Sequence, residues 1–451
     1  FKTAIRKAAK SAVPRMIIGG YDCAYGMTGS WGHTGLHFAE GIEDAADFYI
    51  WIPSYGRDRD NGDLPLKPYQ FTGSLALHGK LGILEMDIRN PNIPNLYFGH
   101  YKSRNWQETH NYRTFATALN RLAASAIALG GGFHCYNLQP HWFLSDKAQD
   151  AWRNAFRIAE QRRGEGFSEE QIAVFIDENS NLYSNLHPHW VPSFFNFKGQ
   201  VVAAVQRAGF KHNYYLLRDA LHPDFKAPLM LLFADAGTMT PEEIVKIRER
   251  HGNSGRVIVW HGCPGFLACG DYETLSKSLG FDVSPLQGNR QQTPLVAAND
   301  TDPVMKGISG FFMQEPNFLP FVFSPSWRIG KDGSTILAKY YGTDIPGMAV
   351  KRYQDHTEIF IGQPGSVSPQ LIRNAGAEAK MHPLLESDDL FIYGGSLMTV
   401  CGSLGRGIRK IRIPDGIREV VPLTPHKVLH NDGKNFEVDI SDAEVAVFLL
   451  K

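Results

Sequence analysis

The strongest constraint on the fold is an alternation in the first 160 residues, where short apolar runs are separated by stretches with helical spacing. Such alternation is typical of β–α units, which build parallel sheets. Residues 109–129 have the pattern of an amphipathic helix that ends at Gly130. Because a barrel of eight such units takes about 250 residues, we expect residues 1–165 to form the C-terminal half of a (β/α)8 TIM barrel. The four apolar runs cover residues 15–21, 47–52, 81–87 and 131–136.

Two further regions follow with different patterns. Thr240 and Pro241 suit the N-cap and the first position of a helix in the second region. There, apolar runs between helical stretches predict an open, doubly wound α/β domain over residues 166–385. From about residue 389 the runs shorten and alternate, which predicts a small antiparallel β domain over residues 386–451. The runs of the second region lie at residues 172–177, 214–217, 229–233 and 257–260, and those of the third at 391–393, 397–401, 408–413, 436–440 and 445–450.

The composition excludes several classes of function. Among 451 residues, 46 Lys and Arg balance 46 Asp and Glu, so no net charge would attract nucleic acid or an anionic membrane. The five cysteines are scattered and form no CxxC pair, which indicates neither a disulfide framework nor a zinc site. No apolar run reaches the roughly 18 residues of a membrane-spanning helix. We expect no metal, no cofactor and a neutral partner such as a sugar, for which the 12% aromatic residues could supply stacking surfaces.

The start of the sequence reads as the middle of a helix. Residues 1–10 have neither an initiator Met nor the apolar stretch of a signal peptide. We therefore expect residues upstream of Phe1 in the natural gene product, cleaved or carried by another chain. Whether the protein is cytoplasmic or periplasmic stays open.

The most informative segment is the third apolar run, because it ends in charged residues. Glu85 and Asp87 share one strand face, since side chains alternate along a strand, and Arg89 follows. In barrels the active site lies at the carboxyl ends of the strands. Arg89 can pair with one of the acids and keep it ionised, as a glycosidase nucleophile requires. The alternative is a structural ion pair at the end of a strand.

Polar and aromatic residues near other strand ends are candidates for sugar binding. Tyr55 could donate a hydrogen bond to the nucleophile, and Arg57 or Arg59 could hold hydroxyl or acidic substituents, although a solvated charged loop explains them equally well. An indole at Trp142 could stack on a sugar ring, although packing is the commoner role of an aromatic side chain. The predicted substrate-binding set is Tyr55, Arg57, His78, Asp87, Arg89, His134, Asn137 and Trp142, with Tyr21, Asp22 and Tyr136 similarly placed.

Three other motifs are interpreted as structural. His187 and His189 resemble a metal ligand pair but lack a third ligand at a diagnostic spacing. The three glycines at 130–132 lack the spacing of a dinucleotide loop. His261, Gly262 and Cys263 imitate a nucleophile elbow, but the following Pro264 has no N–H for an oxyanion, so a buried structural cysteine is expected.

The order of half barrel, open α/β domain and small β domain resembles the family 42 glycoside hydrolases, the β-galactosidase group of a clan of retaining barrel glycosidases, over nearly the whole chain. The resemblance implies a flavodoxin-like trimerisation domain, similar to a glutamine amidotransferase without its active site, and then a β-sandwich. It also implies that the Glu ending the seventh barrel strand is the nucleophile, which corresponds to Glu85. The general acid/base would end the fourth strand, which has no counterpart in this sequence.

We therefore expect a retaining, β-galactosidase-like glycoside hydrolase that cleaves a β-linked sugar with Glu85 as its nucleophile. The expected partners are a carbohydrate substrate and either copies of the same chain in a trimer or a complementing N-terminal half-barrel segment. The alternative is an inert, amidotransferase-like or carbohydrate-binding assembly subunit. The sugar and the linkage stay open.

Overall fold

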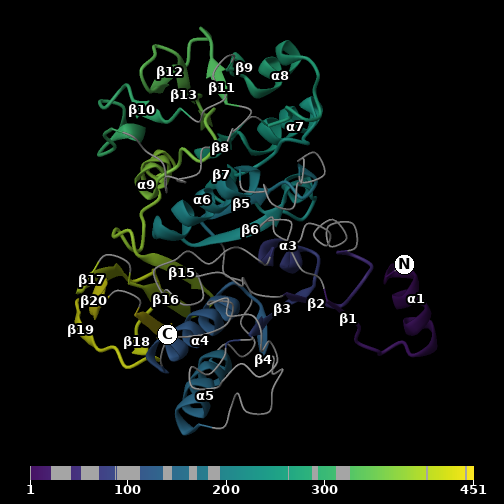
Figure 1. The fold of residues 1–451 in the computed structure, drawn as a ribbon, viewed down its shortest axis with the longest axis vertical. Helices are drawn as coiled ribbons and strands as arrows, with labels where there is room; N and C mark the ends of the chain where they lie inside the picture. Colours follow the sequence, from purple (N-terminus) through teal and green to yellow (C-terminus); the bar gives the residue numbers. More distant parts are fainter. Residues whose placement is uncertain are drawn as a thin grey trace, which may run out of the picture.

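The structure is a computed structural model. Three groups of sheets follow one another along the chain and lie in separate parts of the molecule (Figure 1). The expected α/β content and the parallel strands are confirmed. None of the helices within the described ranges is long and apolar enough to cross a bilayer. The described residues are 2–21, 42–51, 71–86, 88, 112–135, 145–161, 170–180, 193–262, 264–286, 293–310, 326–402, 405–441 and 444–451.

The first sheet contains four parallel strands: β1 (Gly19–Tyr21), β2 (Phe48–Trp51), β3 (Leu81–Met86) and β4 (Gly132–Cys135), in that order. Each strand falls within one of the four apolar runs of the sequence. The accompanying helices are α1 (Lys2–Ala12), α3 (Thr72–Leu77), α4 (Tyr112–Ala128) and α5 (Asp146–Glu160). The helix expected between the last two strands is therefore confirmed as α4.

One face of the first sheet packs against helices. Leu84 and Met86 of β3 belong to one buried cluster with Phe115 and Leu122 of α4 and Trp152 of α5. Burial of this cluster holds α4 and α5 on the sheet, because apolar area removed from water is the main favourable contribution to packing. Since side chains alternate along a strand, the residues between these positions point to the other face of the sheet.

The second sheet contains eight strands in the order β10-β12-β13-β14-β8-β7-β5-β6. Its parallel part comprises β5 (Ile172–Ile176), β6 (His212–Leu216), β7 (Met230–Phe233), β8 (Arg256–His261) and β14 (His356–Ile361). Two buried clusters cover its two faces. Helices α6 (Ser193–Arg207) and α9 (Pro369–Glu378) pack on one face, and α7 (Pro241–His251) and α8 (Tyr272–Leu279) pack on the other.

Helix α7 begins where Thr240 and Pro241 predicted a helix start. The Thr240 hydroxyl accepts a hydrogen bond from the Glu243 backbone N–H, and the Glu243 carboxylate accepts one from the Thr240 N–H. Pro241 occupies the first turn, where its missing N–H costs nothing. Reciprocal capping of this kind satisfies two backbone donors that a helix end leaves unpaired.

The antiparallel extension of the second sheet was not expected from the sequence. It comprises β10 (Leu295–Ala297), β12 (Thr335–Tyr340) and β13 (Pro346–Arg352), and β9 (Val283–Pro285) pairs separately with β11 (Trp327–Ile329). These strands are short, or are buried along most of their length, so they lack the polar–apolar alternation that marks a half-exposed strand. Short 3₁₀ turns occur at Leu217–Leu221 and Pro303–Met305.

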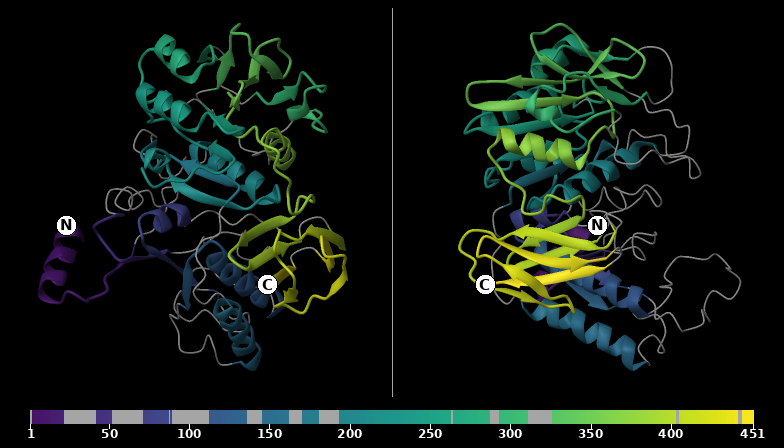
Figure 2. Two further views of the ribbon diagram at one scale, coloured as in Figure 1. Left: turned by 180° about the vertical axis from the view of Figure 1, so that it is seen from behind. Right: turned by 90° about the vertical axis from the view of Figure 1, so that its left-hand side faces the viewer.

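The C-terminal region contains two antiparallel sheets that pack face to face. One is formed by β15 (Leu390–Gly394), β16 (Leu397–Cys401), β21 (Val445–Leu450) and β18 (Val420–Pro422). The other is formed by β17 (Gly407–Arg412), β20 (Asn435–Ile440) and β19 (Val428–Asn431), and one buried cluster joins the two. The first of these sheets also packs on α4 and α5, as Figure 2 shows from the side. The sequence predicted five of these strands and missed β18 and β19.

The three groups of sheets fall within residues 1–165, 166–385 and 386–451. The domain boundaries themselves remain predictions.

Candidate active site

Glu85 is the penultimate residue of β3 and is 1% exposed. Its neighbours Leu84 and Met86 point into the cluster with α4 and α5, so the Glu85 side chain lies on the face away from the helices. In a parallel β/α sheet that curves into a barrel, this face becomes the interior, and the carboxyl end of the strand becomes the end at which active sites lie. Glu85 thus lies near the carboxyl end of a strand, as expected from the sequence.

His134 lies directly across from Glu85 on the neighbouring strand β4. Because Phe133 and Cys135 pack toward the helices, His134 shares the face of Glu85. Its Nε2 is 3.7 Å from Glu85 Oε2, so the two form an ion pair when the imidazole is protonated. The side chain of His134 is partly exposed, whereas that of Glu85 is almost fully buried. The structure therefore brings together two of the predicted site residues.

This pair has a definite chemical capacity. A cation beside a buried carboxylate favours its ionised form, and a fixed carboxylate anion can attack an electrophilic carbon. The adjacent Cys135 cannot take this part, because burial raises the pKa of its thiol to about 12 and keeps it protonated at neutral pH.

His78 lies elsewhere. It follows α3, at the amino end of β3, so the length of the strand separates it from Glu85. Its Nε2 is 2.9 Å from Asp219 Oδ1 in the second region, and its ring packs edge-on against His222 with centroids 5.0 Å apart. His78 thus joins the first sheet to the second region, and this position does not support its predicted contact with substrate.

The remaining predicted residues lie outside the described part of the chain. Their roles therefore stay predictions. They are Asp22, Tyr55, Arg57, Arg59, Asp87, Arg89, Tyr136, Asn137 and Trp142, and only the backbone of Tyr21 is placed, at the end of β1.

The structure describes some residues of the motifs that were interpreted as structural. His261 ends β8 and is buried; its Nδ1 is 2.9 Å from the Ala234 carbonyl oxygen, and its Nε2 accepts the Gly365 N–H. Burial lowers the pKa of His261 to about 4, so the ring is neutral and serves as a structural link at neutral pH. Gly262 turns the chain with φ +70°, whereas Cys263, His187 and His189 lie outside the described residues. Among all the residues that the structure describes, no group of three or more His, Cys, Asp or Glu side chains is placed to hold a metal ion.

Sequence reasoning missed one polar cluster, at the carboxyl ends of β5 and β7. Asp177 accepts hydrogen bonds from the backbone N–H groups of Ser180 and Thr238, and the Ser180 hydroxyl lies 2.5 Å from Asp235. The chain reverses its order between β5 and β7, and open α/β sheets bind ligands at such a point. Here the two carboxylates bind the turns themselves, so the cluster is structural. Aspartates at the ends of two buried strands, Asp177 directly after β5 and Asp235 two residues after β7, are the signal that could have located it.

Comparison with known proteins identifies the fold. No family profile matches the chain, and no curated protein sequence matches it. A β-galactosidase from the Antarctic haloarchaeon Halorubrum lacusprofundi has a similar structure, with a TM-score of 0.61 and 12% identity over 99% of this chain and 66% of that one. A GH42 β-galactosidase from G. stearothermophilus gives a TM-score of 0.62 and 12% identity over 98% of this chain and 65% of that one.

An α-L-fucosidase from Paenibacillus thiaminolyticus is also similar, with a TM-score of 0.60 and 12% identity over 100% of this chain and 70% of that one. The chain thus spans just under two thirds of the length of the two β-galactosidases. At this identity the likeness establishes a GH42-like fold, and the resemblance expected from the sequence is confirmed at that level.

Proposed function

We propose that the chain is the larger part of a retaining, β-galactosidase-like glycoside hydrolase in which Glu85 is the nucleophile. The observation that carries the proposal is the placement of Glu85 in a GH42-like fold: buried, near the carboxyl end of β3, on the helix-free face and beside His134. We also propose that the three groups of sheets correspond to a half barrel, a flavodoxin-like domain and a β-sandwich.

The proposed reaction has two displacements at the anomeric carbon. A Glu85 carboxylate oxygen forms a bond to that carbon while the bond to the leaving oxygen breaks, and the general acid gives its proton to the leaving oxygen. Water, deprotonated by the same acid/base group, then breaks the glycosyl ester and restores the Glu85 carboxylate. His134, when protonated, would favour the anionic form of Glu85 that each cycle needs.

The acid/base carboxyl group is proposed to come from a complementing N-terminal half-barrel segment, on the same polypeptide or on another chain. Support comes from the first sheet, in which β1 and β4 are the edge strands among the described residues, so both have an edge that further parallel strands could extend. In a retaining mechanism the two carboxyl groups lie about 5 to 5.5 Å apart.

A homotrimer is proposed as the assembly, with the second region supplying the contacts between subunits. Its support is the resemblance of the domain order to the family 42 glycoside hydrolases, which implies a trimerisation domain in this region. Sedimentation at micromolar concentration would give three times the chain mass, whereas a monomer would contradict this assembly.

The proposed function is tested by trapping the glycosyl ester. The chain, complemented by its N-terminal segment, is incubated with a 2-deoxy-2-fluoro-β-galactoside, whose fluorine slows hydrolysis of the ester. Mass spectrometry of peptides should find one fluorosugar on Glu85. A parallel incubation with the fluoro-fucoside tests whether the fucosidase likeness extends to the substrate. A label on another carboxylate would show that Glu85 is not the nucleophile. No label in a preparation that folds and binds sugar would favour the alternative of an inert assembly subunit.

A further inference from the structure

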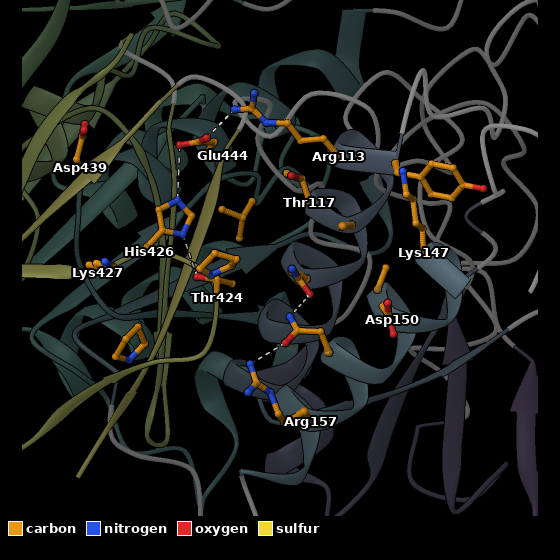
Figure 3. A pocket seen from close by; sticks show the side chains of 18 of the residues that line it. Arg113, Thr117, Lys147, Asp150, Arg157, Thr424, His426, Lys427, Asp439 and Glu444 are labelled. Carbon is orange, nitrogen blue, oxygen red and sulfur yellow. Dashed lines mark hydrogen bonds and ion pairs between the residues drawn. The ribbon is translucent and has the colours of Figure 1, made fainter. Parts of the chain in front are cut away.

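A groove of about 980 Å³ lies beside the packed contact between the helices α4 and α5 and the C-terminal β domain (Figure 3). One wall comes from the outer sides of these helices, and the other from the segment around β18 and β19 and the start of β21. Because α4 packs between the first sheet and this groove, the groove lies on the opposite side of the sheet from Glu85. It is therefore separate from the candidate active site.

The carboxylates that line the groove already have partners. Glu444 lies 2.5 Å from Arg113 Nη2 and accepts the Ser441 N–H at 2.9 Å. Burial alone would raise the pKa of Glu444, but the Ser441 N–H and the charge of Arg113 outweigh it and lower that pKa, so Glu444 is ionised. Asp439 pairs with Arg406, and Asp150 pairs with Arg153. The negative charge of the lining is thus largely neutralised.

Several cations of the lining are not neutralised in this way. Neither Lys427 on the β-domain wall nor Lys147 on the helix wall has a carboxylate partner within the described residues. Lys147 instead lies over the Tyr112 ring, 5.6 Å from its centroid. Arg157 donates Nη2 to the Leu423 carbonyl at 2.7 Å and to Asn154 at 2.8 Å, so its bonds go to neutral acceptors and its charge stays unbalanced. Both walls therefore present uncompensated positive charge.

The rest of the lining suits hydroxyl groups. The amides of Asn120 and Asn154 bond to each other at 2.8 Å, and Thr117 lies one turn of α4 from Asn120. Amide and hydroxyl side chains both donate and accept hydrogen bonds, as sugar hydroxyls do.

We propose that this groove binds an anionic saccharide chain, one that carries uronate or sulfate groups, with Lys427 contacting it from one wall and Lys147 and Arg157 from the other. The choice of a saccharide among polyanions rests on the proposed function; the preference for an anion rests on the lining alone. The site would hold a polymeric ligand on the outer surface while its sugars are processed elsewhere.

The test measures binding by isothermal titration calorimetry to three probes: an oligogalacturonate, a sulfated galactan oligosaccharide and a neutral galacto-oligosaccharide of equal length. At least one anionic probe should bind, at least tenfold more tightly than the neutral one. The double variant Lys147→Gln/Lys427→Gln should lower that affinity at least tenfold. The matched control Lys246→Gln/Lys277→Gln removes the same charge from α7 and α8 and should bind as the unaltered chain does.

Three results would overturn the proposal: no binding of either anionic probe, equal loss of affinity in the control variant, or a DNA oligonucleotide binding as tightly as the saccharides. Repeating the titration with Glu85→Gln separates this site from the proposed function. Unchanged binding by that variant supports a distinct groove site, even if Glu85 proves to have no role in hydrolysis. Lost binding would contradict it.

Discussion

The position of a single residue in a strand decides which side of a sheet it serves, and Glu85 illustrates this. Leu84 and Met86, one position away on either side, are buried against α4 and α5, whereas Glu85 lies on the helix-free face opposite His134. A shift of one residue in the register of β3 would turn Leu84 and Met86 to the helix-free face and Glu85 toward the helices. The buried apolar neighbours therefore fix the orientation of the carboxylate.

Glu85→Gln is expected to lower the hydrolysis rate by several orders of magnitude. The amide keeps the shape of the side chain but cannot attack the anomeric carbon as an anion. Steady-state kinetics on a β-galactoside would measure the loss, with circular dichroism to show that folding is unchanged. Asp87→Asn is the control, because both acids share a strand face. Loss of turnover in Asp87→Asn with most of it retained in Glu85→Gln would reverse the assignment.

His261 is expected to make stability depend on pH. Its folded pKa of about 4 lies below its ordinary value of 6.5, so the unfolded chain binds the proton more tightly. Stability is therefore full above 6.5 and is lost as pH falls toward 4, by about 2 kcal/mol down to about pH 5 for this residue. Urea unfolding at several pH values should give a steeper decline for the unaltered chain than for His261→Gln. Identical pH slopes would show that His261 does not contribute.

At the scale of elements, α4 is the helix on which two parts of the molecule meet. One side packs on β3 and β4, and its C-terminal half packs on β15, β16 and β21 of the β domain. Gly394 at the end of β15 comes so close that a Cβ there would lie 1.8 Å from the Ala128 carbonyl oxygen. Only a glycine allows this approach, so the contact of α4 with β15 depends on it.

Gly394→Ala should therefore destabilise the chain by about 1 to 3 kcal/mol, the usual cost of forcing an extra methyl group into a packed contact. Gly270→Ala is the matched control, because a Cβ at Gly270 meets nothing within 4 Å. Thermal unfolding of the two variants should separate them by several degrees. Equal midpoints would mean that β15 moves away from α4 at little cost.

At the scale of the whole molecule, polar contacts join the first sheet to the second region. Ser74 accepts the Leu216 N–H at 2.7 Å, Thr72 lies 2.5 Å from Asn213 Oδ1, and His78 binds Asp219. The first sheet is therefore held from two sides, by the second region and by the β domain (Figure 1). These contacts support the face of the sheet that α4 and α5 cover and the end at which β3 begins. The opposite face, which carries Glu85, is left to form the proposed site.

Residues 1–451 alone are expected to show no measurable glycoside hydrolysis. A general acid contributes about 10² to 10⁴ to the rate of such reactions, and the proposed acid/base group lies in the complementing segment. Adding that segment should restore turnover, measured with a chromogenic β-galactoside. Robust turnover by a preparation whose mass equals that of these residues would contradict the proposal.

The sequence by itself determined part of the elements and their local chemistry. Apolar runs separated by helical stretches indicated the four strands of the first sheet and four strands of the second, and Thr240 with Pro241 marked the start of α7. Glu85 could be selected because its strand is apolar up to the acid. These features are local, since a strand or a cap is specified by residues within a few positions of one another.

Only the tertiary structure decided which distant residues meet. His134 and His78 were both predicted to bind substrate, yet one lies 3.7 Å from Glu85 and the other binds Asp219 at the opposite end of the strand. The groove, too, exists only because the β domain packs on α4 and α5. The physical reason is that strand pairing and packing are set by the burial of side chains far apart in the chain, and no local pattern records which faces will meet.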